Sequence, residues 1–160
     1  MLDRYLLAKP TVSMLIEWPI LIGIGIIGNL FSWHRIPLHP TTNVAGAILL
    51  IMGLVIHVCT HETLKKHGIR AHHPSKEVKQ LATSGIYSKI RHPSYLGLIL
   101  IYFGFALGCG IVWTLVPAVI FSVMTYLTAI REEEVLKEKF GEEYEEYMRQ
   151  VPWRFIPKVF

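Results

Sequence analysis

The sequence has few charged residues and almost no cysteine, and both scarcities narrow its class. Asp, Glu, Lys and Arg make up 18% of the 160 residues, against about a quarter in an average soluble domain. Hydrophobic residues make up 52%, which indicates that lipid rather than water surrounds much of the chain. Its two cysteines, Cys59 and Cys109, are far apart, and they indicate neither a disulfide scaffold nor a Cys-based zinc site.

Long windows without charge predict four membrane spans. A helix needs about 20 apolar residues to cross a hydrocarbon core of roughly 30 Å. The expected spans are residues 12–31, 44–60, 94–108 and 112–130, and the last two form a hairpin that turns at Gly108-Cys109-Gly110. We therefore predict an all-α helical bundle in one membrane domain. Its parts are two N-terminal spans in 1–60, a cytoplasmic linker in 61–93, the hairpin in 94–130, and a C-terminal helix and lid in 131–160.

Basic residues predict the orientation of these spans. Segment 61–92 carries seven Lys and Arg residues, whereas the loop 34–43 carries only Arg35. The positive-inside rule then predicts a multi-pass protein with both termini in the cytoplasm. The formal net charge of +4 suits contact with membrane lipid. The basic residues are not interleaved with stacking aromatics, so we expect no nucleic-acid partner.

Glycine patterns in the spans predict helix packing. Residues 23–28 match the GxGxxG pattern of dinucleotide-binding loops. That motif requires a preceding strand, whereas here it lies inside an apolar span. Small residues that let two helices approach closely explain it better. We interpret Gly104 and Gly108, a GxxxG pair, in the same way.

A histidine-rich segment at the end of the second span offers a possible metal site. His57 and His61 lie four residues apart and could face one ion, with Glu62, His72 or His73 as further ligands. The HExxH order is absent, and histidines at a membrane boundary commonly serve as polar caps. We therefore expect no metal, and a direct contact with a substrate is the remaining alternative.

Two polar motifs flank the predicted hairpin. Arg91-His92-Pro93-Ser94-Tyr95-Leu96-Gly97 precedes it, and Arg131-Glu132-Glu133-Glu134 follows it. A helix that begins at Pro93 leaves its first N–H groups available for a polar or anionic ligand, and Arg91 is suited to a carboxylate. Because the two spans are antiparallel, both motifs should lie on one side of the membrane and form one pocket.

These motifs resemble the isoprenylcysteine carboxyl methyltransferase family. The similar patterns are Leu81-x-x-x-Gly85-x-Tyr87-x-x-x-Arg91-His92-Pro93-x-Tyr95-x-Gly97 and Glu132-Glu133-x-x-Leu136-x-x-x-Phe140-Gly141-x-x-Tyr144-x-x-Tyr147-x-x-x-Val151-Pro152-x-x-x-Ile156-Pro157. The resemblance covers residues 81–157. It implies a membrane methyltransferase that binds S-adenosylmethionine, releases S-adenosylhomocysteine and takes a lipophilic methyl acceptor from the bilayer.

The resemblance also implies roles for individual residues. The expected cofactor-binding residues are Gly85, Tyr87, Arg91, His92, Pro93, Tyr95, Glu132, Glu133, Tyr144 and Tyr147. A methyl group on a sulfonium is already activated, so the protein mainly aligns the reactants and excludes water. A carboxylate acceptor needs no base, only a cation to hold it. Arg131 is the first candidate for that catalytic cation and Arg154 the second.

Other functions remain open on the sequence. The chain is shorter than the eukaryotic enzymes of the family, so the acceptor is a prenylcysteine-type carboxylate or another lipid, amine or thiol. Sterol reductases, which use NADPH, carry a similar Arg-His-Pro-x-Tyr element but have more spans. A membrane scaffold with a degenerate pocket is the non-enzymatic alternative.

Overall fold

A computed structural model describes residues 13–37, 40–69 and 79–158. In these residues the chain forms five α-helices and no strand; the helices are α2 (Trp18–Leu30), α3 (Thr41–Lys66), α4 (Pro93–Cys109), α5 (Leu115–Phe140) and α6 (Glu142–Gln150). An isolated β-bridge joins Arg35 to Ile111. The all-α fold class is therefore confirmed for this part of the chain.

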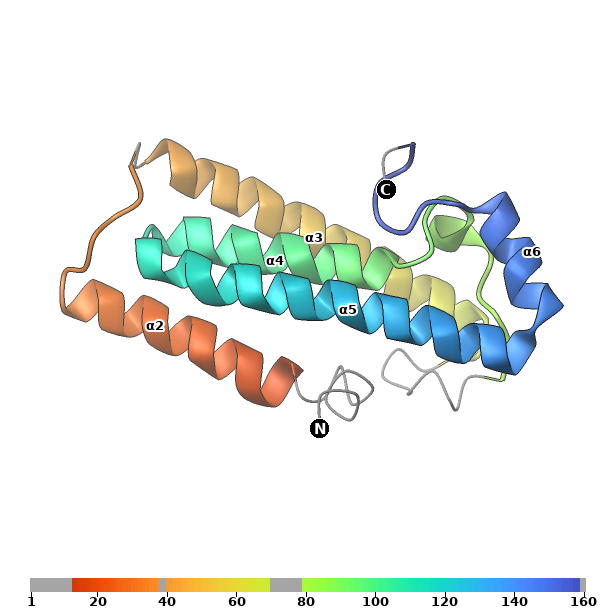
Figure 1. The fold of residues 1–160 in the computed structure, drawn as a ribbon. Helices are drawn as coiled ribbons and strands as arrows, with labels where there is room; N and C mark the ends of the chain where they lie inside the picture. Colours follow the sequence, from red (N-terminus) through yellow and green to blue (C-terminus); the bar gives the residue numbers. More distant parts are fainter. Residues whose placement is uncertain (1–12, 38–39, 70–78, 159–160) are drawn as a thin grey trace.

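The helices form an elongated bundle with a separate layer at one end. Helices α3, α4 and α5 run side by side, and α2 flanks the half of the bundle where α4 ends (Figure 1). Gly110, with φ of +67°, makes the left-handed turn after α4, and the short 3-10 helix Val112–Thr114 leads into α5. Helix α6 and the C-terminal segment cover the end where α4 begins (Figure 1).

Two helices are long and apolar enough to cross a membrane. They are α3 and the helix Val112–Phe140, and only 17% and 39% of their most apolar stretches are buried inside the bundle. Large side chains of α3, such as Ile51 and Val58, are instead exposed. An apolar helix buried so little is typical of contact with lipid. Helices α2 and α4 are shorter, at 13 and 17 residues, so two of the four expected spans meet the length criterion.

Four glycines hold α3 and α4 together, and we call them the glycine seam: Gly46 and Gly53 of α3, and Gly97 and Gly104 of α4. A Cβ atom added to Gly53 would lie 2.6 Å from the Gly97 carbonyl oxygen, and one added to Gly104 would lie 2.6 Å from the Leu50 nitrogen. The two glycines of each helix are seven residues apart, so they share one face. Backbone therefore packs directly on backbone along this interface.

The predicted packing role of the glycine patterns is only partly correct. A Cβ atom at Gly25 would meet Cys109 at 3.1 Å, and one at Gly28 would meet Ile111 at 2.8 Å. At Gly23 and Gly108, by contrast, no atom lies within 4 Å of such a Cβ. Both of these side-chain positions point to open space, so the interpretation is wrong for Gly23. The Gly108 backbone nitrogen still lies 2.5 Å from a Cβ added to Gly46, so Gly108 takes part in the close contact through its backbone alone.

Some predicted boundaries also differ from the structure. Helix α3 continues to Lys66, six residues past the expected end of the second span, because residues 61–66 have helix-forming side chains and a basic last turn. The C-terminal helix is not continuous over 131–150: Gly141, with φ of +54°, separates α5 from α6. The first span becomes regular α-helix only at Trp18, after a π-helical turn at Ser13–Glu17.

His57 and His61 of the histidine-rich segment are part of α3. The segment's proposed additional ligands His72 and His73 lie outside the described residues. Across the ranges that the structure describes, no three His, Cys, Asp or Glu side chains are grouped as metal ligands would be.

Candidate functional site

The hairpin brings the two polar motifs to one end of the bundle, and the C-terminal segment joins them there. Arg91 and His92 directly precede α4, which begins at Pro93. Their backbone N–H groups donate to the carbonyl oxygens of Trp153 and Arg154, each at 2.9 Å. The segment after α6 is thus held against the start of α4. Pro93 has no N–H group to offer a ligand, so its contribution is the fixed start of the helix.

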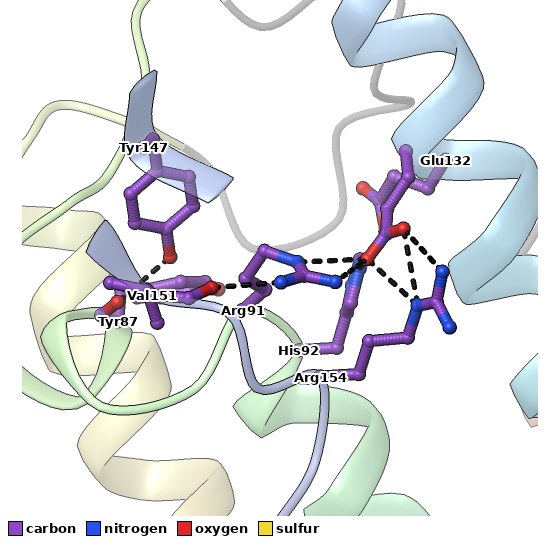
Figure 2. Close-up of polar contacts among 8 residues, drawn as sticks. Tyr87, Arg91, His92, Glu132, Tyr147, Val151 and Arg154 are labelled. Carbon is purple, nitrogen blue, oxygen red and sulfur yellow. Dashed lines mark hydrogen bonds and ion pairs between the residues drawn. The ribbon is translucent and has the colours of Figure 1, made fainter. Parts of the chain in front are cut away.

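The carboxylate of Glu133 is the centre of the site. It accepts hydrogen bonds from Arg91 Nε at 2.9 Å and from Arg154 Nε at 3.1 Å and Nη2 at 3.0 Å, and His92 Nε2 lies 3.2 Å away. Figure 2 shows the two arginines approaching from different sides. We call these four residues the Glu133 cluster. Arg91 also donates to the Val151 carbonyl at 2.8 Å, which ties the cluster to the C-terminal segment.

The cluster keeps Glu133 ionised although the residue is only 3% exposed. Glu133 lies on α5 beyond Ile130, where the uncharged stretch ends. Burial raises the pKa of its carboxyl group, but hydrogen bonds from His92 and Arg154 and the nearby charges outweigh burial and hold the pKa at about 2. The hydrogen bond to Glu133 also raises the pKa of Arg154. A ligand that bound Glu133 would have to displace these partners. The main effect of the Glu133 carboxylate is therefore to order the cluster.

Glu132 gives the site a second carboxylate, in a more open position. Its side chain is 23% exposed, and its Oε2 atom lies 3.6 Å from His92 Nδ1. The ring of Tyr95 stacks on His92, with centroids 5.6 Å apart and an interplanar angle of 19°. A carboxylate beside stacked rings is suited to a ligand that carries a cation or hydroxyl groups.

Three tyrosines form the wall between α6 and the turn before α4. Tyr147 donates from its hydroxyl to the Tyr87 carbonyl at 2.8 Å, and its ring lies 5.9 Å from that of Tyr144. Tyr144 and Tyr147 are 1% and 7% exposed. Burial raises the pKa of all three hydroxyls, so they remain neutral hydrogen-bonding groups.

Gly85 begins the 3-10 turn Gly85–Ser88, and its fit to α3 explains why it is glycine. Its φ is +61°, and an added Cβ would lie 2.8 Å from Thr63 Oγ1. The end of α3, which the sequence assigned to the linker, therefore supports this turn. Sequence reasoning missed Thr63, and the only signal for it was the helix-forming composition of residues 61–66.

The two catalytic candidates lie in different surroundings. Arg131 pairs with Glu134 at 2.6 Å, and its side chain is 48% exposed. Arg154 instead belongs to the Glu133 cluster, with its side chain 31% exposed. The structure thus brings together Arg91, His92, Tyr95, Glu132, Glu133 and Arg154, and it directs the Arg131 guanidinium to an exposed ion pair on α5. Phe155 belongs to the segment predicted as a lid, and its ring lies 6.1 Å from that of His92.

The fold and the site together define an apolar helical protein with a buried ionic cluster at one end. The model of the phospholipid methyltransferase family matches residues 41–143, and the chain belongs to this family. The match includes α3, α4, α5 and all members of the Glu133 cluster except Arg154.

Individual relatives fall into two groups. Protein-S-isoprenylcysteine O-methyltransferases are 30% identical over 167 residues in Rattus norvegicus (94% of this chain, 53% of the relative) and 34% over 119 residues in Xenopus laevis (69% and 39%). A Delta(14)-sterol reductase from Mus musculus is 33% identical over 93 residues (54% and 21%). This chain thus spans about half, or less, of the length of these curated relatives. The predicted resemblance to isoprenylcysteine carboxyl methyltransferases is confirmed.

Proposed function

We propose that the chain is an S-adenosylmethionine-dependent methyltransferase that acts on a lipophilic acceptor at the membrane. The observation that carries this proposal is the convergence of the Glu133 cluster, Glu132 and the three-tyrosine wall at one end of an apolar hairpin. Charged and aromatic side chains beside an apolar helical surface suit a site for a polar cofactor and a lipophilic acceptor. The isoprenylcysteine O-methyltransferase relatives support the reaction class.

The residues at this end suit the cofactor. S-adenosylmethionine presents a sulfonium, an ammonium, a carboxylate, ribose hydroxyls and an aromatic base. Glu132 supplies a partly exposed negative charge, and the stacked rings of His92 and Tyr95 supply aromatic groups beside it. The tyrosine wall joins α6 to the turn at Gly85. We therefore propose that the cofactor is held by the set Gly85, Tyr87, Arg91, His92, Pro93, Tyr95, Glu132, Glu133, Tyr144 and Tyr147.

Methyl transfer requires the protein mainly to align the acceptor with the methyl group of the cofactor. The bound cofactor supplies an electrophilic methyl group on its sulfonium. The residues of this chain orient the acceptor for in-line attack and keep water out. For a carboxylate acceptor such as a prenylcysteine, a cation that holds the carboxylate suffices. We place Arg154 in this role ahead of Arg131, because Arg154 lies in the Glu133 cluster. A multi-pass topology with cytoplasmic termini is part of the proposal.

A second candidate function is an NADPH-dependent reductase of the sterol-reductase type. The observation in its favour is the match to Delta(14)-sterol reductases, in Mus musculus and, at 37% identity over 84 residues, in Arabidopsis thaliana. These matches cover about a fifth of each reductase.

Calorimetric titration of the detergent-purified chain separates the two functions. We expect S-adenosylhomocysteine to bind and NADPH not to bind. Glu132→Gln should weaken S-adenosylhomocysteine binding about tenfold, because it removes a charged hydrogen-bond acceptor. The exposed Glu134→Gln is the matched control and should bind as the wild type does. Binding of NADPH without S-adenosylhomocysteine would overturn the methyltransferase proposal.

A further inference from the structure

A row of aromatic rings leads from the Glu133 cluster toward the apolar part of α5. Phe155 is 6% exposed, and its ring centroid lies 6.1 Å from both the His92 ring and the Tyr126 ring. Tyr126 precedes Glu133 by seven residues, which is two helical turns on the same face and about 10 Å along the axis. Tyr126 is thus the member of this row that lies deepest toward the uncharged stretch of α5.

Arg154 lies between this row and the cluster, and part of its charge faces outward. Its contacts to Glu133 use Nε and Nη2, and Nη1 makes no hydrogen bond to any described residue. Arg91 and Arg154 share the Glu133 carboxylate, yet the Arg91 side chain is 5% exposed and that of Arg154 is 31% exposed. Tyr126 reaches this region through Phe155, the residue that follows Arg154, since the ring centroids of Tyr126 and Phe155 lie 6.1 Å apart.

Apolar side chains continue from Tyr126 along α5. Val119 and Val123 precede it by seven and three residues, so the three side chains share a helical face. Both valines are exposed, by 48% and 52%. This face thus runs from a partly exposed guanidinium, past a tyrosine, onto an apolar surface available to a hydrocarbon chain.

We propose that Tyr126 is an acceptor-specificity residue. Its hydroxyl and Nη1 of Arg154 bind an anionic head group, and the hydrocarbon chain of the same acceptor lies along Val123 and Val119. The inference rests on the proposed function, and it assigns the acceptor side of the site to this face of α5. A guanidinium and a phenol hydroxyl can both donate to a carboxylate, whereas a neutral amide has one acceptor oxygen and forms no ion pair with the guanidinium.

Two synthetic probes test the assignment: N-acetyl-S-farnesylcysteine, which has a free carboxylate, and its primary amide. Both are titrated into the full chain saturated with S-adenosylhomocysteine. We expect the carboxylate probe to bind about tenfold more tightly than the amide, as one charge-assisted hydrogen bond would give. Tyr126→Phe should reduce that preference, because it removes the hydroxyl and leaves the ion pair with Arg154. It should leave binding of the amide probe and of S-adenosylhomocysteine unchanged, which a general structural defect would not do.

The matched control is Ser122→Ala, which removes a hydroxyl one turn from Tyr126 on the same helix. The Ser122 hydroxyl donates to its own helix, at the Ala118 carbonyl, so the preference should be retained. Equal binding of the two probes by the wild type, or a full preference in Tyr126→Phe, would overturn the acceptor assignment. If S-adenosylhomocysteine itself fails to bind the wild type, the proposed function fails instead.

Discussion

Helix α4 is held in two different ways, by the glycine seam along its length and by the Glu133 cluster at its start. The seam contains no charge and depends on the absence of side chains, because backbone atoms of α3 occupy the space of a Cβ. The cluster depends on three ionic or hydrogen-bonded side chains around one buried carboxylate. Both contacts fix the position of α4. The seam does so through the absence of side chains, and the cluster does so through charged side chains.

The glycine seam stabilises the bundle, whereas the Glu133 cluster positions the side chains of the site. Lipid removes the hydrophobic driving force between helices, so close contact of small residues becomes a main source of helix association. A buried ion pair is weak evidence for stability, since desolvation offsets much of its attraction. Charged groups concentrated at one end of the bundle are better explained by function.

The largest expected loss of folding stability is for Gly53→Leu in the glycine seam. The first added carbon would lie 2.6 Å from the Gly97 carbonyl oxygen. Because that obstacle is backbone, α3 and α4 must separate, and we expect destabilisation of more than about 3 kcal/mol. Thermal unfolding in detergent and size-exclusion chromatography measure it, as loss of the folded monodisperse species.

Gly108→Leu is the matched control, on the partner helix α4 at a position whose side chain would point to open space. A Cβ there meets no atom within 4 Å, and leucine is a better helix former than glycine. We expect unchanged or slightly higher stability. Equal destabilisation by the two substitutions would show that close backbone packing at the seam is not what holds the helices.

A smaller loss of folding stability is expected for Glu133→Gln in the Glu133 cluster. The substitution keeps the size of the side chain but leaves Arg91 and Arg154 without their shared counter-charge. We expect destabilisation of about 3 kcal/mol. Glu134→Gln is the matched control, because Glu134 forms an exposed pair with Arg131 and such pairs contribute less than about 1 kcal/mol. Chemical denaturation of the three proteins gives the comparison.

The pH dependence of this difference identifies its cause. Folding lowers the pKa of Glu133 from its usual value of 4.5 to about 2. A depressed carboxyl pKa stabilises the folded state fully above the unfolded value and ceases to do so as the pH falls through the folded value. The stability gap between the wild type and Glu133→Gln should therefore be constant above about pH 5 and close toward pH 2. A gap that persists at pH 2 would point to packing rather than charge.

The two regions were not equally predictable from the sequence. A hairpin turn at Gly108–Gly110 is a local signal, and antiparallel geometry then places Arg91 near Glu133 whatever the details of packing. The pairing of Gly53 with Gly97 is different, since apolar periodicity identifies neither the partner helix nor its register. For the same reason Gly104 and Gly108 were equivalent on sequence, although a side chain would meet α3 at Gly104 and open space at Gly108.

The C-terminal partner of the cluster was the hardest part to predict. An exposed ion pair at i,i+3, such as Arg131–Glu134, satisfies a cation locally, whereas the contact of Arg154 with Glu133 depends on how the chain folds back after α6. The break at Gly141 sets that path. A glycine in a helix-forming segment indicates weakness, but it does not indicate that Gly141 takes a positive φ and that the chain turns there.

The smallest expected effect is at the tyrosine wall, in Tyr147→Phe. It removes the hydrogen bond to the Tyr87 carbonyl and keeps the ring, so we expect a loss of about 1 kcal/mol. Because the bond joins α6 to the turn Gly85–Ser88, hydrogen exchange should rise in that turn and remain unchanged in the seam. Tyr144→Phe is the control, since the Tyr144 hydroxyl makes no hydrogen bond to the described residues. Faster exchange spread evenly over α3 and α4 would contradict the separation of the two regions.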